Sequence, residues 1–298
     1  MKFIILLTLL TINACVFGQN GGYKVLTYNI RYDNKGDGED RWDKRKEGLI
    51  KQVKSINPDV IGFQEVLSRQ KRDFFFFLHN YASVGVGRDD GKNKGEQVPI
   101  FYKKDKFTLL KKGWFWLSET PAKPSKGWDA ACNRMCTWVV LRDTVTHKNL
   151  LFLNTHLDHI GKLAQENSIN QIIDFIYNDA TGYVYDDTQK RDTTNLNQMP
   201  VVWMGDFNLQ PNDSLYQKIT TDGKVTLRTR EDSYKVTETK PEGSIGTFNG
   251  FKLGNNYNGR IDYIWVIDLK VKSYKVLNDK LPNGRWPSDH FPVLIEVY

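Results

Sequence analysis

Short apolar stretches recur along the chain, and most of them contain or end in a carboxylate, amide or imidazole side chain. Five such stretches are KVLTYNI, DVIGFQE, LLFLNTH, PVVWMGDFN and IDYIWVI. Runs of this length that are rich in Val, Ile and aromatic residues predict buried β-strands. The same composition predicts further strands at PIFYKK, MCTWVVLR and FPVLIEVY.

Apolar residues at helical spacing separate several of these strands. The segment from Trp42 to Ile56 carries an apolar stripe, and Asn57–Pro58 stops the helix that the stripe predicts. Further helices are predicted over Arg69 to Asn80, over Leu163 to Tyr177 and in a short segment after Pro211. Strands and helices alternate early and strands dominate late, which predicts two sheets packed together with helices outside.

Three other segments carry weaker signals. Phe74 to Phe77 end the second predicted helix, and we expect a buried helix end rather than a contact with lipid. The polar stretch 179–199 is typical of a mobile surface loop, and the stretch around GTFNGF is hairpin-like. Cys132 and Cys136 would lie about 13 Å apart in an extended strand, so a disulfide between them requires the chain to loop there.

The polar groups at the strand ends form the most informative pattern in the chain. They are Asn29, Glu65, His156, Asp206, Asn208, Asp262, Asp289 and His290. Polar groups beside buried strands are costly unless they pair with one another or hold a metal. They span residues 29 to 290, so a shared site requires one domain, which we expect over residues 19–298.

The residue types limit the chemistry of such a site. Oxygen ligands without cysteine favour Mg²⁺, with Mn²⁺ or Ca²⁺ as alternatives, over zinc. Magnesium commonly uses only one or two carboxylates, and Glu65 with Asn29 fits that pattern. Asp262 and His290 could form a dyad in which the carboxylate fixes the imidazole tautomer and stabilises its charged form.

Each of these residues also has an ordinary structural interpretation. Asn29 alone is typical of a turn or cap, Gly205 to Asn208 could be a turn, and Ser288–Asp289 could cap a helix. Asp262 is harder to explain in this way, because a carboxylate flanked by strand residues must find a partner. The ordered set as a whole favours a functional site.

The ordered set resembles the endonuclease/exonuclease/phosphatase superfamily, which includes relatives of deoxyribonuclease I, apurinic endonucleases, inositol phosphatases, deadenylases and neutral sphingomyelinases. The resemblance covers Lys24 to Tyr298. It implies a four-layered α/β sandwich in which two mixed β-sheets pack face to face with helices outside. It also implies a metal held chiefly by Glu65, with Asn29 and Asp289 close by.

The resemblance further implies how the remaining groups act. Asp206 would activate or orient the attacking water, and Asn208 would bind the phosphate. His290, oriented by Asp262, would contact the scissile phosphate, and His156 would lie on the opposite side near the leaving group. In-line attack at phosphorus would then depend mainly on positioning and electrostatics.

Four further residues are candidates for substrate binding: Arg134, Trp128, His159 and Tyr102. Arg134 could bind a phosphate oxygen with its guanidinium fork, and Trp128 could stack on a base or sugar. The alternatives are a loop that packs on the sandwich, a surface salt bridge at Asp158–His159, and an aromatic core residue at Tyr102.

Composition narrows the substrate less than the motifs do. The chain is 40% apolar and 13% aromatic, which is ample for a core, and it carries a formal charge of +7. The charge mildly favours an anionic substrate.

We expect a nucleic acid cleaved by an endonuclease or 3′–5′ exonuclease. The alternative is a sugar phosphate, inositol phosphate or phosphorylated glycan; a sphingomyelin or a non-catalytic binding module fits less well. We expect a monomer.

The N-terminus predicts export. Lys2 is followed by the apolar run FIILLTLL, which is too short to span a bilayer, and a signal peptide over residues 1–18 would be cut before Gln19. A periplasmic or extracellular protein is therefore expected. The alternative is a lipid anchor on Cys15, within a sequence that loosely resembles a lipobox. No later stretch is long and apolar enough to cross a membrane.

Overall fold

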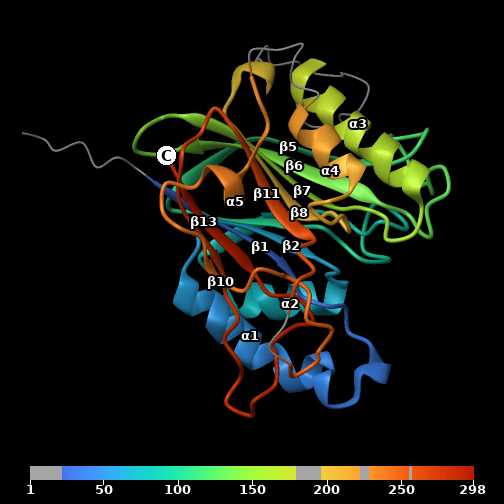
Figure 1. Cartoon of the computed structure of the whole chain (residues 1–298), viewed down its shortest axis with the longest axis vertical. Helices are drawn as coiled ribbons and strands as arrows, with labels where there is room; N and C mark the ends of the chain where they lie inside the picture. The colour runs from blue at the N-terminus through green and yellow to red at the C-terminus, as the bar shows by residue number, and fades with distance from the viewer. Residues whose placement is uncertain (1–21, 179–195, 222–227, 255–256) are drawn as a thin grey trace, which may run out of the picture.

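The protein forms two mixed β-sheets packed face to face, with helices on both outer faces (Figure 1). The computed structural model describes residues 22–178, 196–221, 228–254 and 257–298. Helices α1 and α2 cover one outer face, and α3 and α4 cover the other. This is the predicted four-layered α/β sandwich, and that prediction is confirmed.

Within the described residues, the first sheet has seven strands in the order β10-β12-β13-β1-β2-β4-β3. Their bounds are β1 Tyr23–Asn29, β2 Val60–Gln64, β3 Tyr81–Val84, β4 Ile100–Lys103, β10 Glu242–Gly243, β12 Val271–Val276 and β13 Val293–Val297. Strands β1 and β2 run parallel, so their C-terminal ends lie at the same edge of the sheet.

The second sheet has six strands over the same described ranges, in the order β5-β6-β7-β8-β11-β9. Their bounds are β5 Phe107–Trp116, β6 Met135–Asp143, β7 Asn149–His156, β8 Val201–Asp206, β9 Glu231–Asp232 and β11 Asp262–Ile267. Strands β7 and β8 are parallel, and β11 runs antiparallel to β8.

The helices agree closely with the apolar periodicity. Helix α1 spans Trp42–Ile56 as predicted, and it ends where Asn57 adopts a left-handed conformation with φ 51°. The other helical segments are η1 Lys35–Asp40, α2 Ser68–Phe77, α3 Lys162–Asn178, η3 Leu196–Gln198, α4 Ser214–Thr221 and α5 Ser233–Val236. Helix α2 is shorter than predicted, because its C-cap is Leu78 rather than Asn80.

Three apolar clusters account for the layering. The cluster between the sheets includes Val25, Phe152 and Ile264. A second cluster joins the outer face of the six-stranded sheet to α3 and α4, and a third joins the seven-stranded sheet to α1 and α2. Strands in both sheets are therefore buried on two sides, which explains why they appear in the sequence as continuous apolar runs.

The prediction of a buried helix end at Phe74 to Phe77 is right for one residue and wrong for two. Phe74 is fully buried and stacks on Phe63, with the ring centroids 4.4 Å apart. Phe75 and Phe76 are 44% and 78% exposed. A helix turns by 100° per residue, so four consecutive side chains cannot all face one sheet.

Other expectations have mixed outcomes. Cys132 and Cys136 are free; Cys136 lies in β6, and Cys132 lies in a bend before that strand. The stretch around GTFNGF folds back on the following chain, as a hairpin-like stretch would, with the Thr247 and Phe248 N–H groups donating to the Gly259 carbonyl, and within the described ranges it forms no regular strand pair beyond an isolated bridge from Phe248 to His290. The predicted signal peptide and most of the 179–199 loop lie outside the described residues. Among the residues that are described, no helix is long and apolar enough to cross a membrane.

Candidate active site

The strand ends converge as the sequence predicts. Strand register places His156 opposite Asp206, and Asp206 opposite Asp262, across three neighbouring strands. In the other sheet Asn29 ends β1 and Glu65 directly follows β2. The strand-end residues of the two sheets lie at the same end of the sandwich. The parallel pairs β1/β2 and β7/β8 therefore bring residues from across the chain to one edge.

Three residues at this edge have a strained backbone. Arg31, Glu65 and Asn208 have φ values of 56°, 61° and 50° and follow strands β1, β2 and β8 within two residues. Left-handed φ is uncommon for residues other than glycine, and such residues cluster at functional sites. The turns aim polar side chains into the space between the sheets.

The packing of β8 against β7 requires a glycine at position 205, in the GDFN motif. The φ of Gly205 is 152°, and a Cβ atom added there would lie 2.0 Å from the carbonyl oxygen of Thr155. Only glycine allows β8 to approach β7 this closely. The close approach places Asp206 beside His156.

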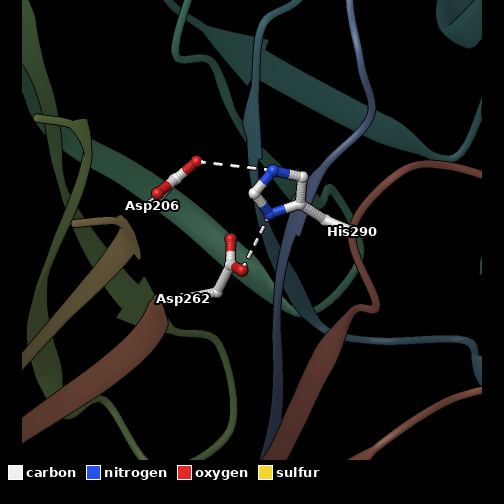
Figure 2. A group of neighbouring side chains, drawn as sticks. All are labelled: Asp206, Asp262 and His290. Atoms are coloured by element: carbon white, nitrogen blue, oxygen red, sulfur yellow. Dashed lines mark hydrogen bonds and ion pairs between the residues drawn. The ribbon is translucent and has the colours of Figure 1, made fainter. Parts of the chain in front are cut away.

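His290 lies between two carboxylates. Its Nδ1 is 2.9 Å from Asp262 Oδ2, and its Nε2 is 3.7 Å from Asp206 Oδ2. Figure 2 shows one aspartate joined to each nitrogen of the imidazole ring. Burial lowers the pKa of His290, but Asp262 and then Asp206 outweigh it, so the pKa is raised well above its ordinary value. The ring is therefore an imidazolium, and the predicted dyad is present.

His156 has the opposite protonation state. Its Nε2 lies 3.5 Å from Asp206 Oδ2, but burial lowers its pKa well below the ordinary value, and Arg134 and Arg88 lower it further. A neutral imidazole can form hydrogen bonds without adding positive charge. The two histidines therefore offer the site one charged and one neutral ring.

Asp206 is the central carboxylate. Burial is the main cause that raises its pKa to about 7, and the neighbouring Asp262 adds to the shift. It accepts hydrogen bonds from Asn29 Nδ2 at 2.9 Å and from the Asn208 backbone at 3.0 Å. A carboxylate with a pKa near neutrality is suited to accept a proton in catalysis.

Asn29 links the two sheets. Its Nδ2 donates to Glu65 at 3.0 Å as well as to Asp206, and its oxygen accepts from the Arg31 backbone N–H at 3.0 Å. In this orientation Asn29 positions two carboxylates, and its oxygen is already used. It could ligate a metal directly only if the amide were turned over.

Two groups of residues have the chemistry to hold a divalent metal. Glu65 accepts from the Tyr32 backbone at 3.1 Å, and Asp289 makes a long ion pair with Arg31 at 3.9 Å. Burial raises the pKa of Asp289, and Glu65 adds to this shift. A hard cation between Glu65 and Asp289 would relieve that repulsion, so these oxygen ligands fit Mg²⁺.

The second group is Asp206, Asp262 and His290, whose ligand atoms lie within 4.8 Å of one another. In this group the His290 ring already bridges both carboxylates, and an imidazolium has no free lone pair for a metal. Of the predicted metal ligands Asn29, Glu65 and Asp289, the two carboxylates therefore fit a cation better than this second group does.

The site opens into a cleft of about 480 Å³. Of the predicted residues, the cleft is lined by Glu65, Arg134, His156, His159, Asp206, Asn208, Asp289 and His290. Arg134 is held by Asp158 at 3.2 Å and by His159 Nδ1 at 2.8 Å. Asn208 is fixed by its Nδ2, which donates to the Leu157 carbonyl at 3.1 Å.

Two predicted substrate-binding residues lie elsewhere. Tyr102 is buried among the apolar residues between the sheets, so the prediction that it faces the cleft is wrong, and its alternative as a core aromatic holds. Trp128 does not line the cleft, and its backbone N–H is bonded to Glu119. Tyr102 fails because strand alternation points it inward, where an aromatic ring packs well.

The sequence reasoning missed several residues that line the cleft: Arg31, Tyr32, Arg88, Glu96, Cys132, Phe248 and Ile261. Arg31 lies two residues after Asn29, so proximity to a motif could have identified it. Arg88 and Glu96 lie in a loop between β3 and β4, where no periodic pattern marks them.

A larger cavity of about 630 Å³ lies at the other end of β1, beside Lys24. Asp59 in that cavity already pairs with Lys103 and Lys106. None of the polar strand-end motifs reaches it. The 480 Å³ cleft is therefore the candidate active site.

Comparison with known proteins identifies the family of the chain. Residues 26–290 match the family model described as the Endonuclease/Exonuclease/phosphatase family. The chain belongs to this family. The predicted membership is confirmed, and the hydrolases of this family depend on divalent metals and act on phosphoester bonds.

Solved structures of this family include close matches to the whole chain. A mannosyl-6-phosphatase from Bacteroides thetaiotaomicron is 36% identical, with 93% of this chain and 99% of that chain covered and a TM-score of 0.81. A family protein from Bacteroides vulgatus is 33% identical, with the same coverage and TM-score. The human Nocturnin catalytic domain is 19% identical with a TM-score of 0.68, which shows the shared fold.

Curated relatives in the family are more distant. The CCR4-Not complex 3′–5′-exoribonuclease subunit Ccr4 of Mycosarcoma maydis is 24% identical over 341 residues, which cover 92% of this chain and 50% of that protein. Its counterpart in Emericella nidulans is 22% identical, with 86% and 47% covered. The chain thus spans about half the length of these relatives.

Proposed function

We propose that the protein is a Mg²⁺-dependent phosphoesterase that hydrolyses a phosphate monoester of a sugar or a similar small molecule. The observation that carries the proposal is the set of strand-end groups in one cleft: an imidazolium between two aspartates, a neutral histidine, and the carboxylates of Glu65 and Asp289. Nine-tenths of the chain also aligns with a mannosyl-6-phosphatase.

The protein groups would divide the reaction between them. Asp206 accepts the proton of the attacking water, and Asn208 and the His290 imidazolium donate hydrogen bonds to phosphate oxygens. Mg²⁺ bound by Glu65 and Asp289 would neutralise charge on the phosphate. His156 donates a hydrogen bond to the leaving oxygen as the phosphorus–oxygen bond breaks. The proton that Asp206 removed from water passes through solvent to the leaving alkoxide, so the products are an alcohol and phosphate.

The lining of the cleft favours a small molecule over a nucleic acid. Arg31, Arg88 and Arg134 face it, but so does Glu96 on the same wall as two of these arginines. A groove that follows a nucleic acid backbone is typically a continuous basic surface. A carboxylate on the wall would repel a second phosphate there.

A 3′–5′ exoribonuclease is the second candidate. The curated relatives with that activity support it, and so does the basic charge of the chain.

We further propose that the protein is exported, since the apolar segment after Lys2 has the composition of a signal peptide. Processing before Gln19 and lipidation at Cys15 would be distinguished by mass spectrometry of the mature protein.

The substrate proposal is tested by direct hydrolysis. Purified protein with Mg²⁺ is incubated with mannose 6-phosphate, a panel of sugar and inositol phosphates, single-stranded RNA and plasmid DNA. We expect phosphate release from one or more small molecules and little shortening of RNA. Processive release of nucleotides from RNA, with inert sugar phosphates, would replace the first candidate with the second.

A further inference from the structure

An arginine–glutamate pair forms part of the cleft wall outside the catalytic groups. Arg88 Nη1 and Nη2 donate to Glu96 Oε2 and Oε1 at 2.9 and 2.8 Å, in a two-bond fork. Both side chains are mostly buried, with 17% and 18% of their surfaces exposed. Arg88 helps to lower the pKa of His156, but neither Arg88 nor Glu96 contacts the phosphate in the proposed reaction, so the pair's position in the cleft calls for a further explanation.

The pair lies on the leaving-group side of the site. A small cavity that adjoins the main cleft is lined by Glu65, Arg88, Glu96, Arg134 and His156 together. His156 is the ring proposed to contact the leaving oxygen. A substrate whose phosphate lies between His290 and His156 would therefore extend its leaving group toward Arg88 and Glu96.

The loop that carries the pair is held in place. The Arg88 and Glu96 backbones are bonded across the loop at 3.0 Å, and the Arg88 carbonyl accepts from Trp116 Nε1 at 2.7 Å and from Asn133 Nδ2 at 3.2 Å. The partly buried Lys71 ammonium donates to the Gly85 carbonyl at 2.7 Å. These bonds preorganise the pair before any ligand arrives.

The chemistry of the pair is complementary to neighbouring hydroxyl groups. Each hydroxyl can donate to the Glu96 carboxylate and accept from the Arg88 guanidinium, and the fork places donors and acceptors side by side. A phosphate would gain from Arg88 but would be repelled by Glu96. The pair therefore suits a neutral polyol and disfavours a second anionic group.

We propose that Arg88 and Glu96 bind adjacent hydroxyl groups of a sugar leaving group and so set the specificity of the enzyme for phosphorylated hexoses. This inference rests on the proposed phosphoesterase activity. It assigns a role in substrate recognition to two residues that do not contact the phosphate in the proposed reaction. The scissile phosphate and the sugar ring are then recognised by separate parts of one cleft.

The test compares substrates that share the phosphate and differ in the leaving group. Wild type and Glu96→Gln are assayed with mannose 6-phosphate, with its 2-deoxy and 3-deoxy analogues, and with p-nitrophenyl phosphate, which has no hydroxyl groups. Glu242→Gln is the matched control, because Glu242 pairs with Lys275 on the surface and is 59% exposed.

We expect Glu96→Gln to lower kcat/KM for the hexose phosphate at least ten-fold more than for p-nitrophenyl phosphate, mainly through KM. The deoxy analogue that lacks a bound hydroxyl should lose much less from the substitution. Equal losses on both substrates would mean a structural role and would overturn the proposal, as would no loss on either.

Calorimetric titration with mannose 6-phosphate in the absence of metal separates this inference from the proposed function. Binding that weakens in Glu96→Gln supports the sugar site even if turnover is absent. Hydrolysis of p-nitrophenyl phosphate with no preference for any hexose phosphate would sink the sugar site alone. Absence of all metal-dependent hydrolysis would sink the proposed function.

Discussion

At the scale of single residues, His156 and His290 in the cleft differ because their neighbours differ. Asp262 and Asp206 stabilise the charged form of His290, whereas burial and two arginines stabilise the neutral form of His156. The sequence alone shows two histidines at strand ends and cannot show this difference. It depends on distances between residues from separate strands.

Asp262 should be needed to keep His290 charged and oriented. We expect Asp262→Asn to lower kcat by about 10³- to 10⁴-fold, as removal of an orienting carboxylate does in other hydrolases. The measurement is hydrolysis of p-nitrophenyl phosphate with saturating Mg²⁺, alongside circular dichroism. Asp268→Asn, at a partly exposed aspartate paired with Arg228, serves as the control. A folded Asp262→Asn variant within three-fold of wild type would contradict the role of the dyad.

Asp206 should lower the stability of the metal-free protein at neutral and higher pH. Its pKa is raised from an ordinary 3.8 to about 7, so between these values the folded state holds a proton that the unfolded state releases. Stability from this residue is therefore present below pH 3.8 and is lost as pH rises toward 7.

Asp206→Asn removes that loss. The measurement is thermal unfolding without metal at pH 4, 6 and 8. At pH 8 the variant should have a higher Tm than wild type, by about 2–4 °C for each kcal/mol of stability regained. The difference in Tm should be smaller at pH 4. Turnover should fall sharply in the same variant. A variant that is less stable than wild type at pH 8 would show that the hydrogen bonds of Asp206 outweigh its burial.

At the scale of elements, the strands and the catalytic set could be predicted, and most of the substrate-facing wall could not. Strands buried on both faces appear as continuous apolar runs, and polar residues at their ends are conspicuous for that reason. Arg88 and Glu96 lie in a loop held by tertiary hydrogen bonds, which leave no period in the sequence. Phe248, rather than Trp128, lines the cleft because its bridge to His290 holds it there.

The run of four phenylalanines in α2 provides a test of helix packing. Phe74 contacts Trp42, Phe63 and Phe101, so we expect Phe74→Ala to lower the free energy of unfolding by about 3–5 kcal/mol. Phe76 is mostly exposed, and Phe76→Ser should change it by no more than about 0.5 kcal/mol. Chemical denaturation measures both. Similar losses in the two variants would mean that the helix is rotated from the position described.

At the scale of the whole molecule, one buried arginine joins segments from both ends of the chain. The Arg45 guanidinium donates to the carbonyls of Ile30, Arg31, Asp40 and Pro287 at 2.6–3.0 Å. It therefore connects the loops that carry Arg31 and Asp289 to helix α1. Neither periodicity nor motif spacing predicts this role.

Arg45→Met should leave those carbonyls unsatisfied and lower the free energy of unfolding by about 2–5 kcal/mol. It should also weaken Mg²⁺ binding, measured by calorimetry, because the loop that carries Asp289 loses an anchor. Lys51→Met, at an exposed position of the same helix, is the control and should change neither quantity appreciably. Unchanged metal affinity in a destabilised Arg45→Met variant would limit Arg45 to a structural role.

The most direct test of the account is metal-dependent hydrolysis at Glu65. Purified wild type, Glu65→Gln and the surface control Glu242→Gln are assayed for release of p-nitrophenol from p-nitrophenyl phosphate, with chelator and then with increasing Mg²⁺. We predict that wild type and the control are inactive with chelator and recover fully with Mg²⁺. Glu65→Gln should recover only at much higher Mg²⁺ or not at all. Chelator-resistant turnover, or normal Mg²⁺ dependence in Glu65→Gln, would contradict a metal-dependent phosphoesterase site at this edge of the sheets.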